Sequence, residues 1–251
     1  MDIRIYENRQ LMGEDAAQEI AKKLEELLAV HDDVNVIFAA APSQNEMLEA
    51  LCLYEDIDWN HVNAFHMDEY IGLDSNKPQC FGKFLKDRLF SRLPFKSVHY
   101  LNGNAQNLED ECTRYTDLII EHPPHIICMG IGENGHIAFN DPPVANFNDP
   151  KRVKVVQLDE PCRRQQVNDG CFDAIEQVPT HALTLTIPVM LAASYIYCVV
   201  PGAAKAKAVH DTMQREIVEM YPATILRKHA NTMLFLDKQS SSLLNKTGSR
   251  G

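Results

Sequence analysis

The stretch Gly130-Ile131-Gly132-Glu133-Asn134-Gly135-His136-Ile137-Ala138-Phe139-Asn140-Asp141-Pro142 decides how this chain is interpreted. It follows a short, mostly apolar run at 125–129 that predicts a buried strand. Glycines let a backbone turn tightly and approach a ligand closely, so Gly132 and Gly135 are candidate substrate-binding positions. A strand that leads through glycines to an imidazole, His136, and a carboxylate, Asp141, is a common way for an α/β protein to build a site. Taken alone, such a turn is equally compatible with a structural role.

Strand-like and helix-like segments alternate along the rest of the chain. Apolar residues at helical spacing predict amphipathic helices at 14–30 and 108–119. Short apolar runs predict strands at 34–40, 62–66, 98–101, 153–158, 182–187, 195–200 and 232–236. This alternation predicts one α/β domain with a mostly parallel, doubly wound, Rossmann-like sheet and helices on both faces. No linker or repeat interrupts it, so residues 1–244 are expected to form the domain and 245–251 a polar tail.

Composition and charge narrow the classes of function. The chain has 251 residues and a formal net charge of −11, so nucleic acid is not an expected partner. Its seven cysteines contain no C-x-x-C pair and its N-terminus has no signal-peptide core, which predicts a cytoplasmic protein with reduced thiols. The uncharged run 182–200 approaches the length of a membrane span. Pro188 and Ser194 divide it, however, and its first residues alternate like a strand, so no membrane association is expected.

Polar residues follow several predicted strands, where ligands of parallel α/β sheets bind. Ser43 and Gln44 come after the strand at 34–40, where Ser43 is either an N-cap or part of a phosphate site. Asp68 and Glu69 come after the strand at 62–66. In an enclosed site their repulsion raises one pKa and yields a usable base, whereas the alternative is a solvated acidic turn.

Two further positions carry positive charge. Lys205 lies in the first turn of a helix after Gly202, where the helix dipole disfavours a cation unless an anion binds. Arg163 and Arg164 follow the strand at 153–158 and form either an anion clamp or an exposed pair.

No metal and no other cofactor is expected. No group of histidine, cysteine and aspartate residues has metal-ligand spacing in the sequence. The letters at 130–135 fit G-x-G-x-x-G, but His136 and Pro142 do not continue into a tightly packed helix, which argues against a dinucleotide site.

Taken together, these segments resemble the glucosamine-6-phosphate deaminase (isomerase) family. The matching stretches follow the family's order, cover nearly the whole chain and read FHMDEYIGL at 65–73, LNGNA at 101–105, the motif at 130–142, PTHALT at 179–184 and GAAKA at 202–206. The related 6-phosphogluconolactonases share the fold, but their histidine motif typically continues GHTASLFP rather than GHIAFN. The resemblance therefore places this chain on the deaminase side.

What the resemblance implies is an aldose–ketose isomerisation of an amino-sugar 6-phosphate with loss of ammonia and without a metal. By position, Asp68, with Glu69 beside it, resembles the base that moves a proton between C2 and C1. His136 resembles the acid/base that opens the sugar ring, and Asp141 stands where a glutamate orients that histidine.

The resemblance also implies a phosphate site. Ser43, with Gln44 beside it, Arg163 and Lys205 fall where the family holds the 6-phosphate.

Three departures from the family pattern predict a divergent member. Asn134 stands where the family has an aspartate, and an amide orients an imidazole but does not stabilise its charged form as a carboxylate does. Asp141 is shorter than the family's glutamate, and Ala41-Pro42-Ser43-Gln44 replaces a Gly-Gly-Thr-Pro loop. The alternatives are galactosamine 6-phosphate as substrate, a weakened activity, a lactonase, or a non-catalytic sugar-phosphate-sensing domain. The resemblance also leaves assembly into a homo-oligomer open.

Overall fold

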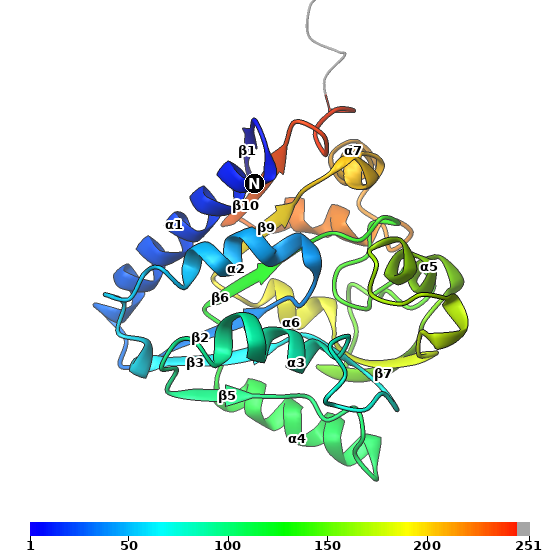
Figure 1. The fold of residues 1–251 in the computed structure, drawn as a ribbon, viewed down its shortest axis with the longest axis horizontal. Helices are drawn as coiled ribbons and strands as arrows, with labels where there is room; N and C mark the ends of the chain where they lie inside the picture. Colours follow the sequence, from blue (N-terminus) through cyan, green and yellow to red (C-terminus); the bar gives the residue numbers. More distant parts are fainter. Residues whose placement is uncertain (245–251) are drawn as a thin grey trace, which may run out of the picture.

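A seven-stranded parallel sheet forms the centre of the protein in the computed structural model, which describes residues 1–244 (Figure 1). Its order is β1 (Asp2–Tyr6), β10 (Thr232–Asp237), β9 (Tyr195–Val200), β6 (Ile126–Met129), β2 (Val34–Phe38), β3 (Val62–His66) and β5 (Ser97–His99). Each neighbouring pair is parallel. The predicted α/β class with a mostly parallel sheet is confirmed, and the polar tail at 245–251 lies outside the described residues.

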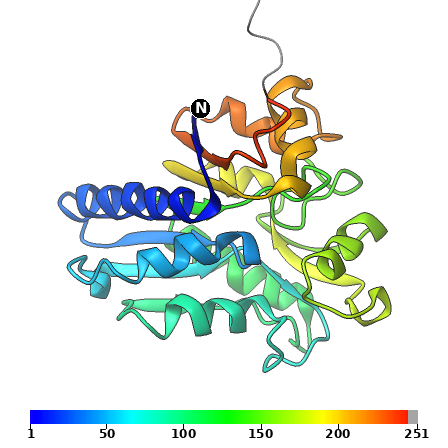
Figure 2. The same cartoon turned by 45° about the horizontal axis from the view of Figure 1, so that its top comes forward.

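Helices cover both faces of this sheet because its strands are apolar on both sides. Alternate residues of β2 show this, since Val36 and Phe38 belong to one hydrophobic core and Ile37 to the other. The first core is covered by α1 (Arg9–Leu28), α2 (Asn45–Leu51) and α3 (Phe81–Leu85), which Figure 2 shows stacked along one side. The second is covered by α4 (Leu108–Glu121), α6 (Ile187–Leu191) and α7 (Ala206–Gln214).

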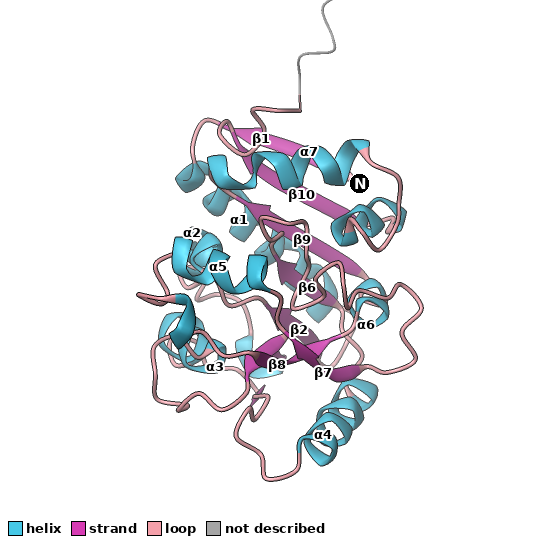
Figure 3. Cartoon of the chain, turned by 90° about the vertical axis from the view of Figure 1, so that its right-hand side faces the viewer, coloured by secondary structure: helices cyan, strands magenta, loops and turns pink. Residues whose placement is uncertain are grey.

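Two of the predicted strands, together with a short strand at 68–70 that the sequence did not predict, form a sheet of their own. They are β4 (Asp68–Tyr70), β8 (His181–Leu185) and β7 (Val153–Gln157), and both of their pairings are antiparallel (Figure 3). The segment at 182–200 is divided into β8, α6 and β9, as expected. Within residues 1–244, no helix is long and apolar enough to span a membrane.

The strand order reverses between β2 and β6. From β2 the chain adds β3 and β5 on one side, whereas β6 returns to the other side of β2 and is followed outward by β9 and β10. The two loops that leave β2 and β6 therefore diverge to opposite faces and leave a crevice between them, which is where doubly wound folds bind ligands.

Candidate active site

A cleft lies at this reversal point. It is lined by the loop after β2, by Met67 and Asp68 after β3, and by Gly130, Gly132 and His136 after β6. Lys205, from the short helical turn Ala203–Lys205 after β9, closes one end. Four separate strand ends thus supply Ser43, Asp68, His136 and Lys205 to one cleft, as their positions in the sequence predict.

The imidazole of His136 is held by two side chains of its own loop. Its Nδ1 lies 2.9 Å from Oδ1 of Asp141 and 2.8 Å from Oδ1 of Asn134. Asn134 also accepts a hydrogen bond from the backbone N–H of His136 at 3.0 Å and donates one from Nδ2 to Oδ1 of Asp141 at 2.8 Å. The ring edge bearing Nε2 is therefore left for the cleft. The shortened Asp141 still reaches the ring, so the position of its carboxylate does not count against a catalytic His136.

The surroundings of Asp141 favour its ionised form. Burial alone would raise its pKa, but the His136 ring and the Asn134 amide outweigh burial and hold the pKa of Asp141 below its ordinary value. An aspartate at position 134 could not donate the hydrogen bond that Asn134 Nδ2 gives to Asp141, and it would place a second negative charge beside that carboxylate. The asparagine is therefore suited to this carboxylate partner.

Asp68 has the opposite environment. Its carboxyl group is buried, and burial together with the neighbouring charges of Glu69 and Asp141 raises the pKa of Asp68 well above its ordinary value. A carboxyl group with a raised pKa in a cleft is suited both to take up and to return a proton. His66, two residues before Asp68 at the end of β3, is not an acid/base candidate. Burial lowers its pKa to about 3, and its Nε2 accepts a hydrogen bond from the N–H of Leu101.

Glu69, expected beside Asp68 as a catalytic residue, points away from the cleft. Its carboxylate accepts hydrogen bonds from the backbone N–H groups of Tyr70 at 2.9 Å, Phe81 at 3.1 Å and Gly82 at 2.9 Å. Phe81 and Gly82 begin α3, where the first N–H groups of a helix have no partner within the helix. Glu69 accepts from these N–H groups, and its negative charge interacts favourably with the positive end of the helix dipole. Adjacent residues of β4 point to opposite faces, which separates the two carboxylates.

The cleft residues that were predicted to hold a phosphate, Ser43, Gln44 and Lys205, offer a hydroxyl, an amide and one cation. Ser43 Oγ accepts from Nε2 of Gln44 at 3.0 Å, which leaves the hydroxyl proton free for a ligand. The same Nε2 donates to the carbonyl of Val199 at 3.1 Å and ties this loop to β9. Lys205 is 6% exposed, and burial lowers its pKa, opposed by the charges of Asp169 and Glu133. An anion bound here would stabilise the buried ammonium.

Arg163 does not reach this cleft, contrary to expectation. Its guanidinium donates to the carbonyl of Ile175 at 2.6 Å and to that of Val178 at 2.9 and 3.2 Å. It thus fastens α5 (Glu160–Asn168) to the turn Ile175–Gln177. The side chains of α5 and its end that do line the cleft are Gln165, Gln166 and Asp169, which sequence reasoning missed.

Gly132 and Gly135 have different roles from each other. A Cβ atom on Gly132 would lie 2.2–2.4 Å from three atoms of the His136 ring, so only glycine lets the ring lie there. Gly135 has φ of +85° and lines a separate hollow beside α7 rather than the cleft. The structure therefore does not bring Gly135 to the substrate position expected for it.

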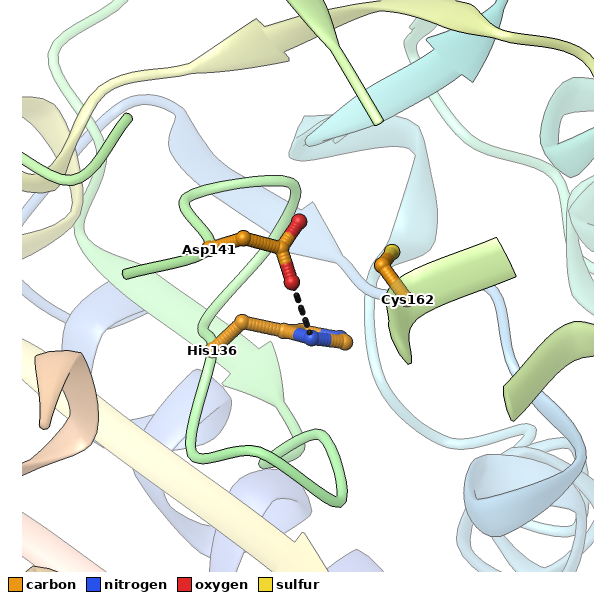
Figure 4. A group of neighbouring side chains, drawn as sticks. All are labelled: His136, Asp141 and Cys162. Atoms are coloured by element: carbon orange, nitrogen blue, oxygen red, sulfur yellow. Dashed lines mark ion pairs between the residues drawn. The ribbon is translucent and has the colours of Figure 1, made fainter. Parts of the chain in front are cut away.

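A third side chain lies against the His136–Asp141 pair. Cys162, on the first turn of α5, lies beside them (Figure 4). The ligand atoms of these three residues all lie within 4.8 Å of one another. The residues are far apart in the sequence, so their spacing could not predict the group.

Fold and site together define an α/β enzyme whose acid–base side chains gather at a topological switch point. The chain belongs to the glucosamine-6-phosphate isomerases/6-phosphogluconolactonase family, which it matches over residues 7–235. It is 38% identical over 190 residues to glucosamine-6-phosphate deaminases of Bacillus cytotoxicus and Bacillus cereus, which covers 76% of this chain and 71% of each relative.

Solved structures agree with this assignment. A monomeric glucosamine-6-phosphate deaminase superposes with a TM-score of 0.87 at 30% identity, covering 97% of this chain and all of the other. A 6-phosphogluconolactonase from Thermotoga maritima superposes with a TM-score of 0.77 at 20% identity, covering 94% of this chain and 99% of the other. At that identity the second likeness shows a shared fold only.

Proposed function

We propose that this protein converts an amino-sugar 6-phosphate, glucosamine 6-phosphate or galactosamine 6-phosphate, into a ketohexose 6-phosphate and ammonia. The observation that carries the proposal is the position of Asp68 and His136 in the cleft that Lys205 closes. The cleft thus combines a protonatable carboxyl group, an oriented imidazole and an anion-binding end. The names of the relatives support the same reaction.

The reaction begins with the sugar ring. His136, held through Nδ1 by Asp141, presents Nε2 to the ring oxygen and transfers the proton that accompanies opening of the pyranose. The ionised Asp141 stabilises the positive charge on the imidazole while it holds that proton. The Ser43 hydroxyl and the Lys205 ammonium hold the 6-phosphate, so the open chain is fixed at its far end.

Asp68 then moves one proton along the open chain. Its carboxylate removes the C2 proton, the C2 electron pair forms the C1–C2 double bond, and the aldehyde oxygen takes a proton from solvent to become the enol hydroxyl. The same carboxyl group returns the proton to C1, and the amino group releases one proton to solvent, which leaves an imine at C2. Water adds to this imine, the C–N bond breaks, and ketose and ammonia leave. The raised pKa of Asp68 suits a group that both takes and returns a proton.

Three substrates distinguish this reaction from its alternatives. Purified protein is incubated separately with glucosamine 6-phosphate, galactosamine 6-phosphate and 6-phosphogluconolactone, and ammonia, ketose phosphate and acid release are measured. Ammonia and ketose phosphate in equal amounts from either amino sugar support the proposal, and the preferred sugar identifies the C4 configuration. Acid release from the lactone without ammonia would identify a lactonase. Tight binding without turnover of any of the three would identify a sensing domain.

Lys205→Met should raise KM for the phosphorylated substrate about 10- to 100-fold, because a hydrogen bond to a charged group contributes about 1.5–3 kcal/mol. The variant should remain folded, since burial already disfavours the charge that methionine removes. Steady-state kinetics and the inhibition constant of inorganic phosphate measure the effect. An unchanged constant for both would remove Lys205 from the phosphate site.

Arg163→Gln is the matched control at a second predicted cation. It should leave KM unchanged and lower the free energy of unfolding by about 1–3 kcal/mol, since buried carbonyls lose their donors. Urea unfolding and the same kinetic assay measure the two effects. A rise in KM comparable with that of Lys205→Met would return Arg163 to the phosphate site.

We also infer a cytoplasmic location and a small-molecule partner only. All seven cysteines are unpaired and six of them are buried, which suits a reducing compartment. The net charge of −11 opposes binding to nucleic acid. Assembly into a homo-oligomer stays a prediction that sedimentation of the purified protein can test.

A further inference from the structure

His136, Asp141 and Cys162 form a buried group of three metal-ligating side chains. Each is no more than 8% exposed. One oxygen of Asp141, Oδ2, has no hydrogen-bond partner among the described residues, although it is buried. The Cys162 thiol is a weak donor to the Asp141 carboxylate and leaves this buried oxygen able to take a stronger partner, such as a cation.

We propose that these three residues are a binding site for a thiophilic divalent cation of the Zn²⁺ type. Sulfur, nitrogen and oxygen ligands from cysteine, histidine and aspartate are the set that Zn²⁺ accepts, whereas Ca²⁺ and Mg²⁺ prefer oxygen alone. Binding breaks the S–H bond of Cys162 and forms an S–Zn bond, and the proton goes to solvent. The two charges of the cation then balance one thiolate and one carboxylate, so the occupied site is neutral.

The distances suit such a cation after small side-chain rotations. Bonds of about 2.0–2.3 Å in a tetrahedral site separate neighbouring ligand atoms by about 3.3–3.8 Å. His136 Nδ1 and Asp141 Oδ1 are 2.9 Å apart and need to separate slightly, while all three ligand atoms already lie within 4.8 Å of one another (Figure 4).

One feature around the group supports the occupied state. Asn134 Nδ2 donates to the Asp141 carboxylate, as the outer partners of metal ligands commonly do. Burial and the charge of Asp141 raise the pKa of the Cys162 thiol, so its thiolate forms only when a cation replaces the proton.

The cation would reach the group through the cleft, because His136 lines it. Metal and catalysis then exclude each other. A cation on His136 and Asp141 occupies the side chains that the proposed ring opening uses. This part of the inference rests on the proposed function, whereas metal binding itself does not.

Cobalt binding tests the site without any turnover assay. Protein treated with a chelator and dialysed is titrated with Co²⁺, whose bond to a thiolate produces a charge-transfer band in the near ultraviolet. Zn²⁺ affinity is then measured by competition with a chromophoric chelator. We expect one site per chain with the thiolate band. The Zn²⁺ affinity of Cys162→Ser and Cys162→Ala should be more than about 100-fold lower, since changes outside the ligand set already cost 10–100-fold.

Cys171→Ser is the matched control, because Cys171 is a thiol that lines the cleft but is not part of the proposed ligand group. It should keep both the band and the affinity. The proposal is overturned if wild-type protein shows no thiolate band, or if the Cys162 variants, shown to be folded by circular dichroism, keep the wild-type affinity. A band that is lost in Cys171→Ser instead would also overturn it. Where turnover is present, Zn²⁺ should inhibit the wild type and not Cys162→Ala, and a chelator should restore the rate.

Discussion

Asp68→Asn should abolish nearly all turnover and at the same time raise the melting temperature of the protein. Asparagine cannot carry the proton between C2 and C1, and loss of a general acid/base costs about 10²–10⁴-fold in rate. The stability should increase because the ionised carboxylate is disfavoured where it lies: burial and the charges of Glu69 and Asp141 raise its pKa. Initial rates of ammonia release and thermal unfolding measure the two effects.

The sign of the pH dependence follows from this raised pKa. In the unfolded chain the pKa of Asp68 is that of an ordinary aspartate, about 3.9. Above this pH, Asp68 in the folded state must either stay protonated or carry an unfavourable charge. The contribution of Asp68 to stability is therefore present at low pH and lost as pH rises through the folded pKa, and Asp68→Asn should remove this loss. In the wild type, kcat/KM should fall on the acid side with a pKa above the ordinary aspartate value.

Glu69→Gln is the matched control for Asp68→Asn. Burial raises the pKa of Glu69 too, but its two oxygens accept three backbone hydrogen bonds and the amide would turn one oxygen into a donor facing a donor. The amide should therefore lower the melting temperature while affecting turnover much less. If Asp68→Asn keeps a rate near that of the wild type, Asp68 is not the base. If it melts below the wild type, the argument from burial is wrong.

Much of the sheet could be predicted from the sequence because buried parallel strands are continuous apolar runs. The run at 62–66 has the bounds of β3, and the strand at 195–200 those of β9. β1 escaped prediction, since this edge strand exposes Ile3 and Ile5 and has no clear pattern. The antiparallel pairing of β7 with β8 was also beyond prediction, because apolar runs do not encode the direction of a partner strand.

The site was predictable where a residue follows a strand and not where it lies on a helix. Ser43, Asp68, His136 and Lys205 each follow a strand of the parallel sheet, so the topology alone brings them together. Arg163 lies within α5, which is too polar to show a hydrophobic face in the sequence. On a helix, neighbouring residues face different sides, so the sequence could not show whether Arg163 faces the cleft.

A signal within α5 was nevertheless present. Four polar residues with helical spacing face the site: Cys162, Gln165, Gln166 and Asp169. The polar stripe at i, i+3, i+4 and i+7, which leaves Arg163 to one side, would have identified the side of this helix that faces the site.

Gly132→Ala should reduce turnover about 10²-fold, because one added methyl group displaces the His136 ring. The new Cβ would lie 2.2 Å from Cε1, 2.3 Å from Nε2 and 2.4 Å from Nδ1 of His136, so the ring must move. Any such movement breaks the 2.9 Å contact with Asp141 and displaces Nε2 from the sugar oxygen. Misplacement of a catalytic group by about 1 Å costs about 10²-fold in rate. Steady-state kinetics of ammonia release measure the loss, and the pH profile should change shape because His136 loses its charged partner.

Gly135→Ala separates this steric effect from backbone strain in the same loop. Its φ of +85° disfavours any side chain, but a Cβ there would have no neighbour within 4 Å. It should lower the free energy of unfolding by about 1–2 kcal/mol and leave the contact between His136 and Asp141 in place. Turnover should then remain well above that of Gly132→Ala. Equal losses of turnover in Gly132→Ala and Gly135→Ala would attribute the effect to strain in the loop and not to the His136 ring. Wild-type turnover in Gly132→Ala would mean that the position of the ring does not set the rate.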